Sequence, residues 1–585
     1  MASESRYWKR FWQTRLGRRR LLQTTALGAA GLAVAAACGD GEDGPGETPA
    51  AATATPSGEP KSGGTFRFPM VGLSSGNPPS LAANTQLTYL AQYPAAYHYS
   101  RLLKFVPDTT ANLDFTQVEG DAAESVPEAV DGVTFNFTLR DNLNFHNISP
   151  VDGRPVTAED VVLSFERFAE ESPNRGNWLR AVEKIEATGE KTLTITLKQP
   201  FAPAFSVLFA NSDGGPWIIP KEVVDQELLE TQPIGSGPFI FERWDPGVVI
   251  KWRKNPDWYG APKPYIDEVE ASLVNDPEVI IQNMAAGNLE ATGWSSALFE
   301  RVGEVPGATV LIGPELVFGA AYFNFAVPPF NDKRVRQALS MAWDRLGVQE
   351  ALDKAGAAGP LTHVTQFEPF YLDPFGPDFG PNSKYYERDV DEAKRLLGEA
   401  GYPNGIDLVG RSSIVYGSVF GDRTEALGLS ARDAGFRMSF DFGEYSGYIS
   451  TTFFGEIAEN ELGIAPLMGA PHDPHNIFFT IFHPTSSRHN WGPRGTDLAE
   501  LPDNSPAGDQ TLLALWDAQA AELDFEARVE IVKEIQRNMA ESMYLVPWTG
   551  YSGVIIHQPW VKNFQWARDY APAVENLPHL WIDRG

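Results

Sequence analysis

Apolar residues recur along this chain with two periods that alternate from segment to segment. Phe135, Phe137 and Leu139 alternate with threonine and asparagine, which is the pattern of a strand with one buried face. Similar patterns occur elsewhere, so the predicted strands are 64–70, 133–139, 193–197 and 436–442. The segments between them repeat with the helical period instead.

The predicted helices begin and end at residues that are typical of helix caps. Thr157 and Asp160 have near-capping-box spacing, and the apolar residues that follow them lie along one helical face. Three helices are bounded in this way, at 157–168, 276–287 and 389–401. Strands and helices therefore alternate, as in α/β proteins, and no short internal repeat indicates a solenoid or propeller.

The N-terminus carries the pattern of an export signal. An Ala- and Gly-rich apolar segment, 21–37, follows Arg18-Arg19-Arg20 and is short for a membrane span. The arginines resemble a twin-arginine signal, and 35–38 resembles a lipobox that has alanine where leucine is usual. We expect 1–37 to be removed and Cys38, the one cysteine, to be lipidated. The alternative is a buried structural cysteine in an uncleaved helix.

The segment after Cys38 has the composition of a tether. Residues 39–62 are nearly all small, polar or acidic, and therefore offer too little apolar surface to form a core. We expect a flexible linker over 38–62 and a protein attached to the outside of a membrane by lipid. The length of 585 residues predicts two or three folded domains after the linker.

Charge and motifs exclude several functions. The net charge of −29 argues against nucleic-acid binding, which requires cationic side chains against phosphates. The sequence contains no Gly-x-Ser-x-Gly, no His-Glu-x-x-His and no P-loop, so we do not expect an enzyme. Other classes that stay open are an adhesin and the receptor of a sensor. No cofactor is expected.

Four segments of the sequence resemble a single protein family, both in their residues and in their order along the chain. They include Gly235-Ser236-Gly237-Pro238-Phe239 and Arg334-Val335-Arg336-Gln337-Ala338-Leu339. The complete segments are 134–168, 235–260, 324–342 and 392–405. Together they resemble the family 5 extracellular solute-binding proteins of ABC importers, which include dipeptide and oligopeptide binders.

The resemblance implies a two-lobed α/β protein that closes at a hinge, the type II periplasmic-binding-protein fold with an additional domain. Domain I would comprise 63–100, 213–313 and 545–585, the additional domain II 101–212, and the distal lobe, domain III, 314–544. It also implies a monomer that delivers a peptide or an oligosaccharide to ABC permease subunits with an ATPase. The protein would work outside the cytoplasm.

Most of the motif residues have a structural interpretation. Gly235 and Gly237 suit turns that need unusual backbone angles. Arg334 and Arg336 flank an amphipathic helix and are expected to pair with surface carboxylates.

The expected ligand site lies at the cleft between the lobes. In peptide-binding relatives, a carboxylate shortly before an Asp-Pro pair holds the peptide ammonium, but here Ala470 and Leu467 occupy the anchor and tryptophan positions. A buried ammonium needs a counter-ion, which Glu444 or Asp473 would have to provide, although Asp473 is also a suitable helix cap. The candidate ligand-binding residues are Trp294, Tyr322, Asn324, Tyr445, Met468, Ala470, Pro471 and His472.

Four of the nine histidines crowd the same region, at positions 472, 475, 483 and 489. Imidazoles can bind zinc or nickel, but this spacing matches no strong metal motif. We therefore expect no metal site, and a polar loop whose histidines face solvent or contact an uncharged ligand.

Overall fold

Residues Pro60–Gly585 form one compact unit. The computed structural model describes residues 58–585 apart from 71–77, 79, 87–88, 107–117, 130, 212–213, 275, 293–295, 315–317, 365–368, 414–417, 469–472, 487–488, 490, 493–500, 502–504 and 565–574. The predicted signal peptide and Cys38 lie outside these residues. No helix of the described part is long and apolar enough to cross a membrane.

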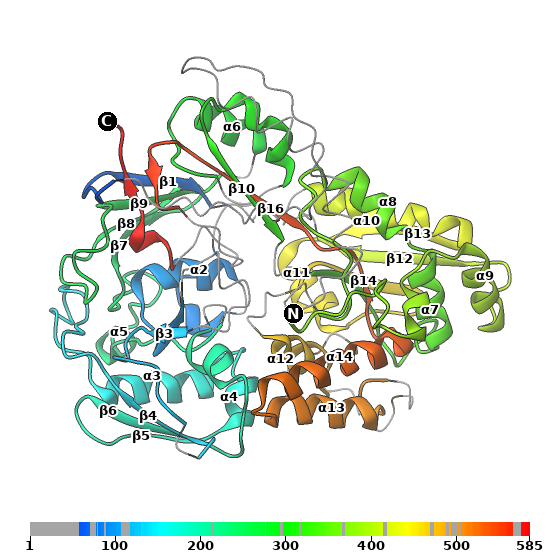
Figure 1. The fold of residues 1–585 in the computed structure, drawn as a ribbon, viewed down its shortest axis with the longest axis horizontal. Helices are drawn as coiled ribbons and strands as arrows, with labels where there is room; N and C mark the ends of the chain where they lie inside the picture. Colours follow the sequence, from blue (N-terminus) through cyan, green and yellow to red (C-terminus); the bar gives the residue numbers. More distant parts are fainter. Residues whose placement is uncertain are drawn as a thin grey trace, which may run out of the picture. The chain divides into compact units, whose positions relative to one another are not determined.

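A four-stranded sheet is built from distant parts of the chain, in the order β1-β9-β8-β7 (Figure 1). Its strands are β1 (Thr65–Pro69), β9 (Glu268–Ser272), β8 (Val249–Lys254) and β7 (Phe239–Asp245). The β1–β9 pair is parallel and the other pairs are antiparallel. Helix α2 (Tyr89–His98) packs against β7, and α6 (Pro277–Ala285) follows β9.

A smaller antiparallel sheet lies in the region assigned to domain II. It has the order β4-β6-β5, with β4 (Thr134–Thr138), β6 (Thr192–Leu197) and β5 (Val182–Ala187). Helix α3 (Ala158–Glu171) packs on β5 and begins with the complete Thr157–Asp160 capping box. The strands and the helix predicted here are confirmed, and Phe135 and Phe137 are buried on the predicted face.

The distal sheet has five strands in the order β13-β12-β14-β11-β15. They are β13 (Phe436–Phe442), β12 (Ile406–Ser412), β14 (Glu461–Met468), β11 (Phe318–Tyr322) and β15 (Val546–Pro547). The first three strands are mutually parallel, whereas β11 is antiparallel to both β14 and β15. Helix α9 (Val390–Glu399) packs against α7 (Lys333–Ala342), and α10 (Ser418–Ser430) connects β12 to β13.

The chain enters and leaves the distal sheet through two neighbouring segments. Strand β10 (Thr309–Pro314) precedes β11, and β16 (Ser552–His557) follows β15. β10 and β16 pair with each other along their whole length (Figure 1), and within the distal sheet β11 and β15 pair at Ala320–Pro547 and Ala321–Val546. We call the connections from β10 to β11 and from β15 to β16 the two crossings; the strands that flank them are paired, β10 with β16 and β11 with β15.

Gly235 and Gly237 are required by close packing and not by unusual backbone angles, so the predicted reason was wrong. Neither glycine has a positive φ. A Cβ atom on Gly235 would lie 1.9 Å from the carbonyl oxygen of His98, and one on Gly237 would lie 2.8 Å from that of Tyr97. The end of α2 thus approaches this loop so closely that no side chain fits between them.

Arg334 pairs with Asp332 at 2.6 Å as predicted, but the prediction for Arg336 was wrong. Arg336 is fully buried in α7 and donates hydrogen bonds to the carbonyl oxygens of Phe330, Ser542 and Met543 at 2.6–3.1 Å. Burial lowers the pKa of Arg336 to about 9. The helical period correctly placed this residue on α7, but it could not show that the chain around 542–543 covers it.

We predict that Arg336→Met destabilises the protein and that Arg334→Met, the control on the same helix, does not. The first change leaves buried carbonyl oxygens without donors and should lower the free energy of unfolding by about 2–4 kcal/mol. The second removes an exposed ion pair and should cost less than about 1 kcal/mol. Urea unfolding measures both, and equal losses would contradict the assignment.

Buried neutral histidines should make the protein sensitive to acid. Burial lowers the pKa of His146 to about 4 and that of His363 to about 3, from 6.5. Below pH 6.5 these groups bind protons in the unfolded state but not in the folded state. The free energy of unfolding should therefore fall from pH 6.5 towards pH 4, by up to about 1.4 kcal/mol per pH unit for each histidine.

The variant His363→Gln isolates one of these contributions. His363 Nε2 donates to the carbonyl oxygen of Leu545 at 3.2 Å, and a glutamine can still donate there without binding a proton. The variant should lose less stability than the parent between pH 6.5 and 4.5. Identical pH slopes in denaturant titrations would show that His363 does not titrate on unfolding.

Candidate functional site

The parallel strands of the distal sheet end at a common edge. Ser412 at the end of β12 is paired with Phe442 at the end of β13, and β14 runs in the same direction. The loops that follow these strands therefore start from one edge, at residues 413, 443 and 469. In open α/β sheets, ligands bind outside the carboxyl ends of the strands.

Both chain crossings reach the distal sheet at this same edge. Because β11 is antiparallel to β14, its first residue, Phe318, pairs with the last residue of β14, Met468. Strand β15 runs opposite to β11 and thus also ends on this side. The loops at the carboxyl edge and the connections to β10 and β16 consequently share one side of the sheet, which makes it the candidate site.

Two of the predicted ligand residues have their backbones at the carboxyl edge. Met468 ends β14, and Tyr445 begins α11 (Tyr445–Ser450), directly after the loop that follows β13. Four further candidates lie outside the described residues: Trp294, Ala470, Pro471 and His472. Their ligand contacts stay predictions.

The structure places Tyr322 inside the distal lobe. It is fully buried, and its hydroxyl donates to that of Tyr448 at 3.1 Å, which in turn donates to the carbonyl oxygen of Ile464 at 2.8 Å. Its ring occupies the space beside Gly463, where a Cβ atom would lie 2.1 Å from it. Tyr322 therefore links β11 to α11 and helps to position the helix that begins at the carboxyl edge.

Asn324 also has partners within its own lobe. Its side-chain amide donates to the carbonyl oxygen of Ile457 at 2.9 Å, and its side-chain oxygen accepts from the backbone N–H of Ala326 at 3.0 Å. Only 6% of the residue is exposed. These contacts give Asn324 a structural role, whereas a contact with ligand stays a prediction.

The two carboxylates considered as counter-ions differ sharply. Asp473 caps α12 (Pro474–Ile477) as predicted, and both of its oxygens also accept from Arg528, at 2.5 and 2.8 Å. This buried carboxylate is already neutralised. Glu444, just before α11, is exposed and accepts no side-chain or capping hydrogen bond from any described residue. Glu444 is therefore the available carboxylate of the two.

Of the two predicted environments for these histidines, exposure to solvent was wrong for His475, His483 and His489, which are buried, whereas contact with an uncharged ligand stays a prediction. The ring nitrogens of His475 lie 3.1 Å from Asn177 Oδ1 and 2.7 Å from Gln519 Nε2. Desolvation, together with the charge of Arg528, lowers the pKa of His475 well below its usual value. Within the described ranges, no group of three or more His, Cys, Asp or Glu could hold a metal ion.

A polar cluster that the sequence did not reveal fixes the second crossing. Buried Arg423 donates from α10 to Thr549 Oγ1 at 2.7 Å and to the carbonyl oxygen of Gly550 at 3.2 Å. Ser552 donates to Asp353 Oδ2 at 2.6 Å. Because these partners are over 100 residues apart in the chain, no local pattern indicates that they meet.

Comparisons with known proteins agree with this arrangement. The family described as bacterial extracellular solute-binding proteins, family 5 (middle region), matches residues 117–452. The chain is 26% identical over 324 residues to probable di/tripeptide-binding protein 5 of Pseudomonas aeruginosa (strain UCBPP-PA14), covering 49% of this chain and 57% of that protein. It is also 26% identical over 524 residues to di/tripeptide-binding protein 2 of the same organism, covering 83% and 89%.

Solved structures show the same fold. The binding protein AgaA from A. tumefaciens R10, in complex with agropinic acid, superimposes with a TM-score of 0.74 at 22% identity. The match covers 89% of this chain and 99% of that one. The predicted two-lobed α/β fold of the type II periplasmic binding proteins is thereby confirmed.

Family members are solute-binding proteins and not enzymes, which agrees with the prediction that the protein is no enzyme. The family match spans more than half of the chain, and the fold is the one that the family shares. The chain therefore belongs to the family 5 bacterial extracellular solute-binding proteins.

Proposed function

We propose that the protein captures a peptide or similar small solute between its two lobes and delivers it to an ABC importer. The main support is the carboxyl edge of the distal sheet, where β12, β13, β14 and β15 end and β11 begins. Rotation at two adjacent crossings can close one lobe over a ligand without disturbing either sheet. Two relatives that are named as di/tripeptide-binding proteins support the peptide class.

An oligosaccharide is the second candidate ligand. Ala470 provides no charge for a peptide ammonium, and Asp473 is occupied by Arg528. A neutral ligand needs neither group, and aromatic side chains such as Trp294 can stack on sugar rings. The relative with agropinic acid bound indicates that this fold also accepts solutes other than peptides.

If the ligand is a peptide, we propose that Glu444 takes the role of the missing anchor. Its carboxylate is exposed, lies at the carboxyl edge and has no ion-pair partner among the described residues. Closure of the lobes would bury the peptide ammonium, and a buried charge is tolerated only beside an opposite one. The remaining candidates would contact the ligand from the segments around it: Trp294, Asn324, Tyr445, Met468, Ala470, Pro471 and His472.

We also propose that the protein works as a monomer at the outer face of a membrane, exported by the twin-arginine route and held by lipid on Cys38. The leader 1–37, the position of Cys38 and the polar linker 38–62 support this part of the proposal. The partners would be permease subunits with an ATPase.

Calorimetry with di- and tripeptides should detect binding that Glu444→Gln weakens by about 30-fold or more, because the peptide ammonium loses its counter-ion. N-acetylation of the peptide should have a similar effect on the parent. Glu456→Gln, which changes another exposed carboxylate of the same lobe, should leave the affinity unchanged.

Two results would contradict this assignment separately. Tight peptide binding that Glu444→Gln does not weaken would remove Glu444 as the anchor but leave the peptide class. Binding of cello-, xylo- or malto-oligosaccharides without binding of peptides would replace the ligand class. Either kind of ligand should raise the melting temperature of the parent, because it selects the folded state.

Replacement of Cys38 by serine tests the tether. The variant should move from the membrane fraction to the soluble extracytoplasmic fraction, because serine cannot carry the thioether-linked lipid. Fractionation and immunoblotting measure the distribution, and unchanged membrane retention would refute the lipid anchor.

A further inference from the structure

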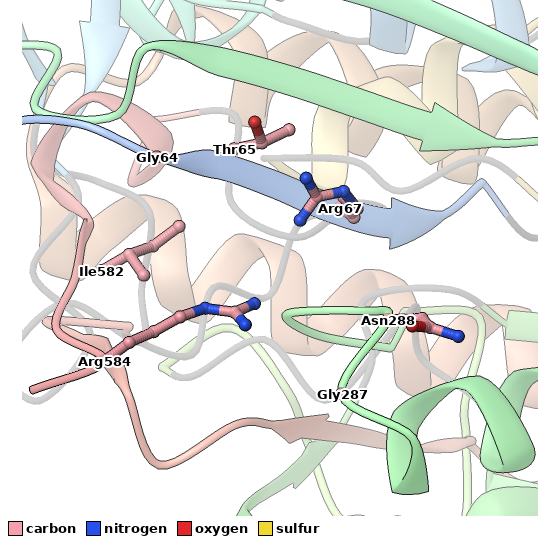
Figure 2. A pocket seen from close by; sticks show the side chains of 7 residues that line it. All are labelled: Gly64, Thr65, Arg67, Gly287, Asn288, Ile582 and Arg584. Atoms are coloured by element: carbon pink, nitrogen blue, oxygen red, sulfur yellow. The ribbon is translucent and has the colours of Figure 1, made fainter.

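A pocket of about 690 Å³ lies beside the four-stranded sheet, away from the carboxyl edge of the distal sheet. Strand β1, the turn after α6 and the C-terminal segment form its walls (Figure 2). We call it the arginine pocket and define it by Thr65, Arg67, Gly287, Asn288, Ile582 and Arg584. Its volume is in the range of pockets that hold small organic ligands.

Two arginines extend into this pocket from different parts of the chain, Arg67 from β1 and Arg584 from the C-terminal segment (Figure 2). Arg584 Nη2 lies 2.5 Å from Glu290 Oε1, and its guanidinium lies 4.7 Å from the centre of the Trp560 ring. Arg67 Nη1 lies 3.5 Å from the same oxygen of Glu290. The two guanidinium groups are therefore neighbours that share one carboxylate oxygen.

The shared carboxylate does not neutralise both arginines. Glu290 is fully buried, and burial raises its pKa, so its charged form is itself disfavoured. Glu270 lies 3.4 Å from Arg67 Nε but is also paired with Lys251. At the edge of the pocket, Glu268 accepts from Thr65 Oγ1 at 3.0 Å, so the surroundings are close to neutral, while the two guanidinium groups themselves share the single buried carboxylate of Glu290.

Both arginines keep guanidinium N–H groups that can donate to a ligand. The exposed fraction of the side chain is 39% for Arg67 and 51% for Arg584, although both are held in place by their contacts. A guanidinium presents its N–H groups as a planar fork that matches a carboxylate. A carboxylate between the two forks would also relieve the repulsion between the guanidinium groups.

We propose that the arginine pocket binds a small organic acid, with a carboxylate between Arg67 and Arg584. The side chain of Ile582 provides an apolar surface for the carbon skeleton of the acid. The side-chain oxygen of Asn288, whose amide nitrogen donates to Asn283 Oδ1 at 3.2 Å, can accept from a ligand hydroxyl. An inorganic anion would make the ionic contacts but would leave most of the pocket empty.

This site is separate from the proposed solute site. All of its residues belong to β1, the turn after α6 and the C-terminal segment, and none comes from the loops at the carboxyl edge. An acid could therefore bind whether or not a solute is held between the lobes. Failure of either proposal leaves the other intact.

Isothermal titration of citrate into the purified full-length chain, at constant ionic strength, tests the proposal. The parent should show saturable binding, and Arg584→Gln should weaken it by about tenfold or more because charge-assisted hydrogen bonds are lost. Arg243→Gln is the matched control, since Arg243 is an exposed arginine of the same sheet with its own partner, Asp245, at 2.8 Å. This control should bind citrate like the parent.

The following results would each contradict the proposal. Absence of saturable citrate binding, or equal affinity in Arg584→Gln and the parent, would refute the site. Inorganic phosphate that binds as tightly as citrate would show that the pocket recognises charge without the organic skeleton. Because Arg584→Gln removes a partner of the buried Glu290, its melting temperature should fall, and the titrations are made at a temperature at which both proteins are folded, so that a loss of binding cannot be attributed to unfolding.

Discussion

Two antiparallel strand pairs, β10–β16 and β11–β15, constrain the rest of this structure. They force the chain to enter and leave the distal sheet side by side, at the edge where β12, β13 and β14 also end. A ligand loop that starts at this edge therefore starts at the edge where β11 begins and β15 ends. Arg423 and Asp353 then fix the returning segment from the distal side. A change in the backbone geometry of the crossings would therefore also move the residues of the candidate ligand site.

Buried polar side chains tie distant segments together. Arg336 binds carbonyl oxygens that are 206 and 207 residues away in the chain, and Arg423 binds Thr549 across 126 residues. Such groups are tolerated in a core only when their hydrogen bonds are satisfied. Each arginine therefore requires a particular backbone path around it, which favours one arrangement of the distal lobe over alternatives.

The same constraint explains why two carboxylates, each directly before a helix of the distal lobe, have different roles. Asp473 is surrounded by donors, because it begins α12 and faces Arg528, so it serves the fold. Glu444 precedes a helix without capping it and stays exposed. Both are acidic residues that come directly before a short helix. Only the neighbours supplied by α14 (Phe525–Ser542), the helix that carries Arg528, distinguish the structural carboxylate from the available one.

The sequence by itself determined the strands at 134–138 and 436–442, the capped helices and the α/β class, because period and capping depend on residues a few positions apart. Its motif order also predicted the two-lobed family fold. Only the tertiary structure decided that Arg336 is buried, that Tyr322 supports α11, and that Gly235 is required by the approach of α2. Tyr322 and Arg336 contact residues that are 126 and 207 positions away in the chain. Gly235 is constrained by backbone packing between separate elements. Local periodicity carries no information about such contacts, because it records which face of an element is buried and not which partner covers it.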